Sequence, residues 1–192
     1  MTDNCVPYRR ADGLLTPGRR LGAGRRDCWV VPLELPPDDP CWFCRYLAGT
    51  APYTILERDD ITATLVTFEQ RGQGHVLVIP IRHVNTVIDL APQEQWAVMD
   101  AVARATRAIV GAFDPSGVAV WQNNGMPAHQ TVPHVHVHVA GTLVSGGTEW
   151  GPVERLATSV TDQISARLQP HLPARADALL VRFSELSEND AG

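Results

Sequence analysis

The chain has 192 residues, and its 16 basic and 21 acidic side chains give a formal net charge of −5 with the seven histidines neutral. All 16 basic residues are arginines. The lack of lysine excludes a phosphate-binding loop lysine, a Schiff-base lysine and a lysine general base, because each of these mechanisms needs an ammonium group. No apolar run comes near the ~20 residues that a membrane helix requires, so we expect a cytoplasmic protein that does not enter a membrane.

The first 40 residues are rich in Pro, Gly and Arg and show no sustained hydrophobic period. This composition predicts a largely irregular N-terminal extension at residues 1–40. We expect the main domain at 41–145 and a helical C-terminal extension at 146–192 that packs on the domain. Six of the 16 arginines lie within the first 26 residues. No aromatic residue lies between Arg9 and Arg26 to stack on a base, so we expect no stable nucleic-acid partner.

A short helix and two strands are predicted at the start of the main domain. The helix covers residues 41–48 and ends at Gly49. The strand-like runs cover 61–68 and 75–81, with a polar turn between them.

A long helix is predicted at Pro92–Phe113. Pro92 and Glu94 stand where the start of a helix favours them. Apolar or weakly polar side chains then recur at helical spacing, at Trp96, Met99, Val102, Thr106, Ile109, Val110 and Phe113.

Two more strands and a second helix are predicted after the long helix. The strands cover 118–122 and 135–140 with a polar loop at 123–130 between them, and the helix covers 152–168 and ends before Pro170. The order strand, strand, helix, strand, strand, helix is typical of an α+β fold, in which helices pack on one side of an antiparallel sheet.

Three histidines alternate with valines from His134 to Val139. Because alternate side chains of a strand point to opposite faces, the valines are expected on one face and the imidazoles on the other. Two kinds of chemistry use such a row. Neighbouring imidazoles bind a catalytic zinc ion that activates water, or one neutral imidazole attacks phosphorus while its neighbours bind the anionic oxygens.

The residues just before this row favour attack on phosphorus. Asn123, Gly125, Gln130 and Thr131 supply neutral hydrogen-bond donors, and the glycine lets the backbone approach a ligand closely. Donors of this type suit the oxygens of a phosphate. An imidazole has an ordinary pKa near ~6.5 and is largely neutral at cytosolic pH, so it serves as a nucleophile without lysine or a catalytic metal.

Two segments resemble the histidine-triad nucleotide-binding family. QTVPHVHVHVA at Gln130–Ala140 is similar to its signature, and GHVLVIPIRH at Gly74–His83 is similar to an earlier strand of the family. Cys41 and Cys44 form a C-x2-C pair that suits one tetrahedral metal ion, and this pair resembles the opening of the zinc-containing bacterial branch. The resemblance implies an antiparallel sheet with one long helix, and a homodimer formed through that helix and an extended sheet.

The resemblance also implies a two-step nucleotidyl transfer. His136, the middle histidine, occupies the position of the nucleophile that bonds the α-phosphate and is then released by water. His138 and Gln130 occupy the positions of the other catalytic groups. The implied substrate-binding positions are Asn123, Gly125, Thr131, His75 and Thr67.

In the zinc-containing branch the metal is structural, and the resemblance implies that its ligands here are Cys41, Cys44, His83 and His134. A set of two cysteines and two histidines completes the tetrahedron and leaves no open position for a catalytic water. The expected cofactor is therefore a structural Zn²⁺.

Two positions depart from the family pattern. Thr67 stands where an Asp or Asn usually bonds the ribose hydroxyls, and His129 stands where the phosphate loop commonly has a small glycine. These departures leave open a non-catalytic nucleotide-binding sensor or partner protein, and the histidine row leaves open a mononuclear zinc hydrolase. The main prediction is a histidine-triad hydrolase or transferase that acts at the α-phosphate of a nucleoside phosphoramidate, acyl-nucleotide or dinucleoside polyphosphate, with a purine nucleotide or nucleotide conjugate as its partner.

Overall fold

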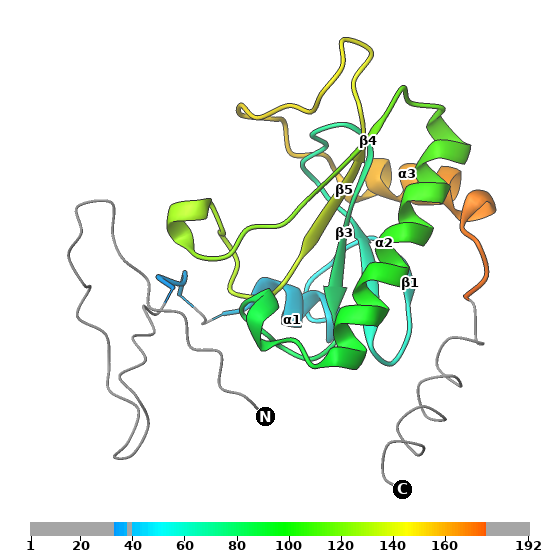
Figure 1. Ribbon diagram of the computed structural model, residues 1–192. Coiled ribbons are helices and arrows are strands. Elements are labelled where there is room, and N and C mark those ends of the chain that lie inside the picture. The colour runs from blue at the N-terminus through cyan, green and yellow to red at the C-terminus, as the bar shows by residue number, and fades with distance from the viewer. Residues whose placement is uncertain (1–32, 38–39, 176–192) are drawn as a thin grey trace, which may run out of the picture.

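The computed structural model describes residues 33–37 and 40–175 (Figure 1). The basic N-terminal arm up to residue 32 and the residues after 175 lie outside this part of the chain. In chain order the helices and strands are α1 (Trp42–Leu47), β1 (Ile55–Arg58), β2 (Thr62–Val66), β3 (Gln73–Pro80), α2 (Pro92–Phe113), β4 (Val118–Trp121), β5 (Val137–Gly141) and α3 (Thr158–Leu168). Single turns of 3-10 helix lie at Val87–Asp89, Met126–Ala128 and Gln169–His171. The strands form one antiparallel sheet in the order β1-β2-β3-β5-β4, which confirms the predicted α+β fold.

The bounds predicted for the long helix are confirmed, since α2 spans Pro92–Phe113 and runs along the sheet (Figure 1). Its first helical residue is Pro92, and the Glu94 carboxylate accepts the N–H of Ala91 at 2.8 Å. A proline at this position and an acidic side chain in the first turn both stabilise a helix start. The helix ends at Asp114, whose backbone is left-handed with φ 48°.

The face of α2 that meets the sheet differs from the stripe seen in the sequence. Trp96, Met99 and Val110 belong to that stripe and are exposed. Val102 and Ile109 of the same stripe are buried, and small alanines beside them let the helix backbone lie close to the sheet. The helical period therefore predicted the helix but only part of its buried face, which is formed by Ala97, Val98, Ala101, Val102, Ala105, Ala108 and Ile109.

Side chains on the two faces of the sheet belong to two separate cores. Val76 and Val78 of β3 pack with α2 and the end of α3 on one face. Leu77 and Ile79 of the same strand pack with Phe43 of α1 on the other face, because neighbouring residues of a strand point in opposite directions. The prediction that all helices pack on one side is right for α2 and α3 and wrong for α1.

Sequence reasoning missed β1, which pairs antiparallel with β2. The strand has four residues, of which one apolar side chain, Leu56, is buried. Its neighbour Glu57 forms an ion pair of 2.6 Å with Arg104 of α2, whose side chain is 7% exposed. This short strand is therefore held by contacts from distant parts of the chain.

The row of histidines begins before its strand. The sequence predicted a strand at 135–140, whereas β5 starts at Val137 and the chain bends over residues 132–134. His138 lies inside β5, and the two earlier histidines lie in the approach to the strand. The expected alternation along one continuous strand is thus only partly right.

The final helix starts later than predicted, at Thr158 rather than at residue 152. Before it, Arg155 pairs with Glu69 in an isolated antiparallel bridge, and the next N–H donates to the carbonyl of Phe68 at 3.0 Å. Backbone groups that bond a neighbouring segment are not available for helical hydrogen bonds. The last residue of α3 is fully buried in the core that α2 forms, so this part of the C-terminal extension packs on the sheet. The division of the chain at residues 40 and 145 stays a prediction.

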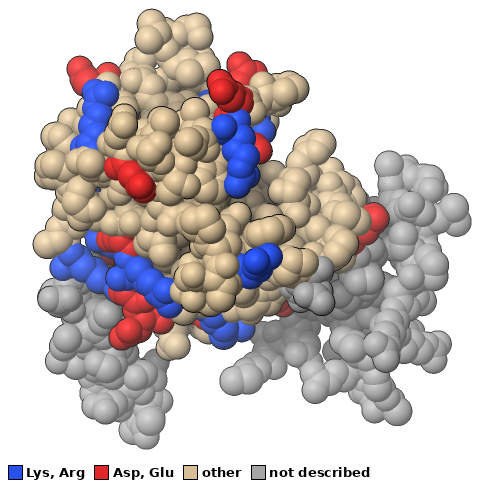
Figure 2. Space-filling view, turned by 180° about the vertical axis from the view of Figure 1, so that it is seen from behind, with Lys and Arg blue, Asp and Glu red and all other residues tan. Residues whose placement is uncertain are grey.

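Charged side chains form small mixed groups on the face seen in Figure 2, with uncharged surface between them. The described surface on that face has no continuous basic area of the kind that follows a nucleic-acid backbone. No helix in the described part of the chain is long and apolar enough to cross a membrane.

Candidate active site and metal centre

A cavity of about 470 Å³ lies on the face of the sheet that carries α1. α1 forms part of its wall, and the end of β2 with the turn after it forms another part. The histidine row contributes His136 and His138, and the loop before the row contributes Thr131. A cavity of this volume accepts one small organic ligand.

Aromatic rings form a continuous wall of this cavity. The centroids of Tyr46 and Tyr53 are 4.2 Å apart, and those of Tyr53 and Phe68 are 4.5 Å apart. Phe43 extends the aromatic surface to the histidines, with its ring 5.2 Å from that of His136. Burial raises the pKa of the Tyr53 phenol to about 12, so its hydroxyl stays protonated at neutral pH. A wall of this kind suits the flat face of an aromatic ligand.

His136 lines the cavity with one ring nitrogen bonded to the backbone. The residue is 5% exposed, and its Nδ1 lies 2.7 Å from the carbonyl oxygen of His134. A carbonyl oxygen only accepts, so Nδ1 holds the proton and Nε2 keeps its lone pair. Burial also lowers the pKa of His136 below its ordinary value. The ring is therefore neutral at pH 7 and has the form of a nucleophile.

His138 is held between two other rings. Trp121 stacks on it with 4.6 Å between centroids and 5° between planes, and Nε2 of His75 lies 3.0 Å from its Nδ1. Burial is the main cause that lowers the pKa of His138 to about 2 and that of His75 to about 4. Both rings are therefore neutral at pH 7, and their hydrogen bond orients His138 beside His136, whose centroid is 5.0 Å away.

Gln130 holds the loop that precedes the histidine row. Its side-chain oxygen accepts the N–H of Gly125 at 2.7 Å, and its amide donates to the carbonyls of Asn85 at 2.7 Å and Val132 at 3.0 Å. Both amide hydrogens and the oxygen are thus used inside the protein. In this structure Gln130 shapes the loop, and the neighbouring Thr131 lines the cavity.

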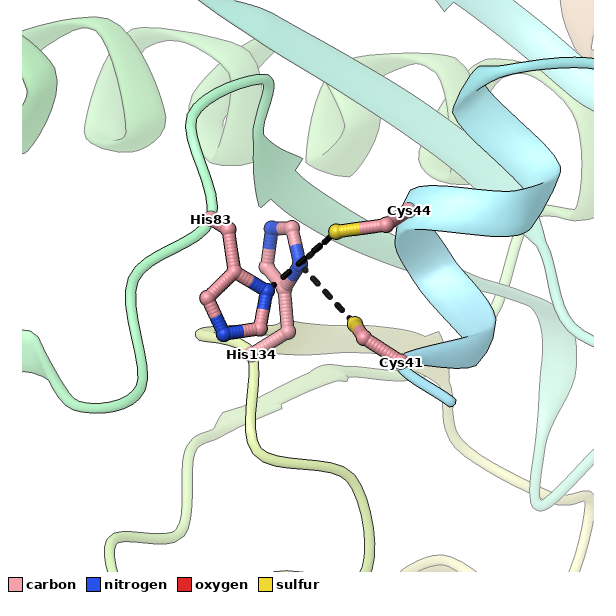
Figure 3. A group of neighbouring side chains, drawn as sticks. All are labelled: Cys41, Cys44, His83 and His134. Carbon is pink, nitrogen blue, oxygen red and sulfur yellow. Dashed lines mark hydrogen bonds between the residues drawn. The ribbon is translucent and has the colours of Figure 1, made fainter. Parts of the chain in front are cut away.

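Cys41, Cys44, His83 and His134 converge beside α1, with all four ligand atoms within 4.8 Å of one another (Figure 3). Sγ of Cys44 is 3.2 Å from Nδ1 of His83 and 3.7 Å from Nδ1 of His134. Sγ of Cys41 is 3.5 Å from the same nitrogen of His134. Sulfur and nitrogen ligands of a tetrahedral zinc ion are about 3.6 Å apart, given bonds of ~2.3 Å and ~2.05 Å. The donor set and its spacing therefore fit zinc.

Hydrogen bonds on the far side of both imidazoles direct the correct nitrogen to the cysteines. Nε2 of His134 donates to the carbonyl of Pro80 at 2.9 Å, and Nε2 of His83 donates to Oδ1 of Asn85 at 2.8 Å. Each acceptor requires the proton on Nε2, so each Nδ1 faces the cysteines in the form that binds a metal. The family resemblance predicted the four candidate ligands but not these outer partners.

The histidines of the row have different surroundings. His134 belongs to the cluster with the cysteines, whereas His136 and His138 line the cavity. Within residues 33–37 and 40–175, the cysteine–histidine cluster is the one group of three or more His, Cys, Asp or Glu side chains close enough to share an ion. The bend before β5 separates His134 from its neighbours, so the geometry argues against a three-histidine catalytic zinc.

Residues 48–143, half of the chain, match the family model of the HIT domain. The matched residues contain the whole sheet, α2 and the histidine row. The chain belongs to the HIT family. Two of the four clustered metal-ligand candidates, His83 and His134, lie inside the HIT domain, and the cysteine pair precedes it.

Curated relatives match about half of this HIT protein. The protein hit of Bacillus subtilis is 33% identical over 99 residues, which are 52% of this chain and 68% of that protein. An adenosine 5′-monophosphoramidase of Schizosaccharomyces pombe is 32% identical over 99 residues, 52% of this chain and 71% of that protein. An asymmetrical bis(5′-nucleosyl)-tetraphosphatase of the same yeast is 34% identical over 98 residues, 51% of this chain and 52% of that protein.

Solved structures of HIT proteins have the same fold. A HIT-like protein of Bartonella henselae has a TM-score of 0.66 at 23% identity, over 71% of this chain and 99% of that chain. A zinc-bound histidine triad protein of Mycobacterium smegmatis has a TM-score of 0.61 at 24% identity, over 70% of this chain and 94% of that chain. These structures confirm the HIT-like fold that the sequence resemblance implied.

The cavity of the HIT domain brings together some of the predicted site residues and leaves others around it. Those that line it are His136, His138, Thr131 and Thr67. Those outside its lining are Asn123, Gly125, Gln130 and His75. The latter group includes side chains that hold the lining residues, since His75 bonds His138 and Gln130 bonds the loop.

Sequence reasoning missed four residues around the site: Tyr53, Phe68, Trp121 and Arg155. The Arg155 guanidinium comes from the C-terminal extension and lies 4.2 Å over the ring of Phe68. No motif marks these residues, and their positions depend on the folded chain. The stacked Trp121 lies near the end of the predicted strand 118–122, two residues before the polar loop, and this place is the one signal that could have found it.

Proposed function

We propose that this HIT protein is a nucleotide hydrolase in which His136 attacks the α-phosphate of the substrate. The state of the His136 ring supports this function most directly. The ring is buried and neutral, its proton is held on Nδ1 by the carbonyl of His134, and it lines a cavity of about 470 Å³. The lone pair of Nε2 is therefore available to phosphorus.

The reaction has two displacements at phosphorus. In the first, Nε2 of His136 bonds phosphorus while the bond to the leaving group breaks, and the leaving group takes up a proton. In the second, water attacks the same phosphorus, the P–N bond breaks and its electron pair returns to Nε2, while the proton of the water goes to solvent. The products are a nucleoside monophosphate and the protonated leaving group. Two easier steps replace one difficult step without lysine.

The names of two relatives support substrates of this class. One is an adenosine 5′-monophosphoramidase and the other an asymmetrical bis(5′-nucleosyl)-tetraphosphatase. Both names describe compounds in which a leaving group is bonded to a nucleotide phosphate. We therefore propose nucleoside phosphoramidates, acyl-nucleotides and dinucleoside polyphosphates as substrates, with a purine base against the wall formed by Tyr46, Tyr53 and Phe68.

The other site residues have supporting roles in this proposal. His138 and Thr131 line the cavity and contact the phosphate oxygens, and Thr67 lies at the sugar. His75 orients His138 through the hydrogen bond of 3.0 Å. Three residues hold the loop so that its backbone N–H groups face the phosphate and the leaving group. These residues are Asn123, Gly125 and Gln130.

We propose that Cys41, Cys44, His83 and His134 hold a structural zinc ion. The four donors match the spacing of a tetrahedral site, and both histidines face it with Nδ1. When bound, zinc cross-links α1 to the segment just before His136. Four protein ligands complete its coordination, so the two displacements involve only the groups of the cavity.

We propose that the protein is a cytoplasmic homodimer that uses α2 and β4. Met99 and Val110 of α2 are 57% and 48% exposed, and Val120 of β4 is 48% exposed. β4 is the last strand of the described sheet. A second copy that pairs with this strand extends the sheet and covers these apolar side chains.

The variant His136→Ala tests the nucleophile. We expect hydrolysis of adenosine 5′-phosphoramidate to fall at least about 10³-fold, with an unchanged circular dichroism spectrum. Rapid acid-free quenching and intact-mass measurement should detect a nucleotidyl adduct on the wild type and none on the variant. His171→Ala is the matched control, because that histidine is exposed and lies outside the cavity lining.

Three results of this experiment are distinguishable. Loss of turnover and of the adduct in His136→Ala alone supports the proposal. An undiminished rate in that variant contradicts the role of His136. Binding of adenosine 5′-monophosphate by the wild type, without turnover of a nucleoside phosphoramidate, an acyl-nucleotide or a dinucleoside polyphosphate, would identify a nucleotide sensor instead.

A further inference from the structure

Arg155 brings a positive charge to the cavity from outside the HIT domain. Its guanidinium lies 4.2 Å over the ring of Phe68 and belongs to the cavity lining. The backbone bridge between Arg155 and Glu69 holds this segment beside the turn after β2. The backbone bridge to Glu69 fixes where the Arg155 side chain starts, and the cation–π contact with Phe68 holds its guanidinium, because an aromatic face attracts a cation.

No carboxylate in the described part of the chain forms an ion pair with Arg155. Glu69 also lines the cavity, but its carboxylate pairs with Arg71 at 3.3 Å. The charge of Glu69 is thus offset by a different arginine. The cavity presents Arg155 as a cation without an acidic partner.

Two hydroxyl groups accompany this cation. The Tyr53 phenol lies near the side chain of Thr67, and the charge of Arg155 acts on its pKa in the direction opposite to burial. Both residues line the cavity. A side-chain hydrogen bond joins these two hydroxyls, so the pair has one hydroxyl proton left for a ligand. One hydroxyl donor beside a guanidinium forms a site that favours an anion over a neutral sugar hydroxyl.

This end of the cavity adjoins the reacting histidines. The backbone N–H of Thr67 donates to the carbonyl of His75 at 3.3 Å, and the ring of His75 bonds His138. In a nucleotide whose 5′-phosphate meets His136 and whose base meets the aromatic wall, the ribose lies between the two. A ribose placed at Thr67 would present its 2′- and 3′-oxygens toward Arg155, which lies over the ring of the next residue, Phe68.

We propose that the cavity selects nucleotides that carry a second phosphate on the ribose, at the 2′- or 3′-oxygen, and that Arg155 binds this phosphate. The inference rests on the proposed function, since it places the 5′-phosphate at His136. A guanidinium forms charge-assisted hydrogen bonds with phosphate oxygens. One hydroxyl of the hydrogen-bonded pair Tyr53–Thr67 donates to the same group. The substrate class is then a ribose-phosphorylated nucleotide with a leaving group on its 5′-phosphate.

Isothermal titration calorimetry of the full chain with three probes tests this inference. The probes are adenosine 5′-monophosphate, adenosine 2′,5′-bisphosphate and adenosine 3′,5′-bisphosphate, and the two bisphosphates distinguish the two ribose positions. We expect one bisphosphate to bind the wild type at least about tenfold more tightly than the monophosphate. We expect the preference to disappear in Arg155→Met, whose unbranched side chain still covers Phe68 without a charge.

Arg167→Met is the matched control. Arg167 also lies 4.2 Å over an aromatic ring, that of Phe113, but it is outside the cavity lining. This variant should keep the preference of the wild type for the bisphosphate. Raising the salt concentration should reduce the preference in the wild type and in the control, because the contact is ionic.

The outcomes separate this inference from the proposed function. If the monophosphate and both bisphosphates bind with the same affinity, the ribose-phosphate site is overturned and the hydrolase proposal stays intact. A bisphosphate preference that persists in Arg155→Met also overturns the inference. If no probe binds, the ribose-phosphate site is wrong, and the hydrolase proposal is still decided by turnover of adenosine 5′-phosphoramidate in the wild type and in His136→Ala. Binding of a bisphosphate alone, with loss of that binding in Arg155→Met, supports the inference.

Discussion

Lowering the pH from 7 to 5 is expected to destabilise the folded protein through His75. This side chain is 1% exposed, and burial is the largest cause that lowers its pKa from the ordinary 6.5 to about 4. The charges of Arg71 and of protonated His136 act in the same direction, and the hydrogen bond to the carbonyl of Glu69 opposes them. Its remaining titratable neighbour, His138, also has a depressed pKa and does not supply a compensating negative charge.

The sign of the effect follows from the order of the two pKa values. The unfolded chain, with a pKa near 6.5, binds a proton more readily than the folded protein, with a pKa of about 4. The stability contributed by neutral His75 is therefore present above pH 6.5 and is lost as the pH falls toward 4. Each unit of pKa difference corresponds to about 1.4 kcal/mol. Between pH 7 and pH 5 the loss in unfolding free energy is about 2 kcal/mol.

Guanidinium chloride titrations at pH 7 and pH 5 measure this loss in the wild type and in His75→Gln. Glutamine keeps a neutral hydrogen-bonding side chain that takes up no proton, so the variant should lose about 2 kcal/mol less than the wild type. The exposed His171→Gln is the control and should follow the wild type. All samples contain excess zinc, so any acid-dependent change at the cysteine–histidine cluster is common to them. Equal losses in the wild type and His75→Gln would refute the argument from burial.

Two further predictions concern the proposed zinc ion and the proposed dimer. Elemental analysis of the purified protein should give about one zinc per chain, and Cys41→Ala combined with Cys44→Ala should remove it; stoichiometric zinc that persists in the double variant contradicts the ligand set. Light scattering should give twice the chain mass of 21.0 kDa, and Met99→Glu or Val120→Arg should shift the protein toward the monomer. A monomeric mass for the wild type at micromolar concentration would contradict the dimer.

Elements with strong local signals were predictable from the sequence. α2 has a proline at its first position, an acidic residue in its first turn and a sustained helical period, and its bounds agree with the prediction. The short helix α1 ends at Leu47, and Gly49 follows its C-cap residue Ala48 with a φ of 68°, the left-handed backbone that favours glycine. In both cases the sequence information lies inside the element or next to it.

Elements that depend on distant partners were predicted less well. β1 has one buried apolar side chain, and its place depends on pairing with β2 and on the ion pair of Glu57 with Arg104. The helical period before Thr158 is real, but the bridge between Arg155 and Glu69 uses that backbone in an extended form. Both outcomes depend on contacts that a local pattern does not contain.

In the candidate site, too, residues that belong to a motif were predicted, and residues that only the folded chain brings together were not. The C-x2-C pair together with the family resemblance predicted which side chains converge, and the structure brings these four together. The aromatic wall and Arg155 have no motif, because rings and an exposed arginine are common anywhere in a sequence. The family resemblance predicted Gln130 as a catalytic group; its side chain makes three hydrogen bonds that hold the loop, and its catalytic role stays a prediction.

The metal centre and the proposed nucleophile are linked through a single residue, His134. Its Nδ1 faces the cysteines, while its carbonyl oxygen accepts the Nδ1–H of His136. Phe43, which lies between the two cysteines in the sequence, places its ring 5.8 Å from that of His134 and 5.2 Å from that of His136. Because the chain bends before β5, one alternating row yields a ring at the metal centre and a ring at the cavity. If His134 held the proposed metal through Nδ1, its carbonyl oxygen would be fixed where it keeps the proton of His136 on Nδ1, which leaves Nε2 available to phosphorus.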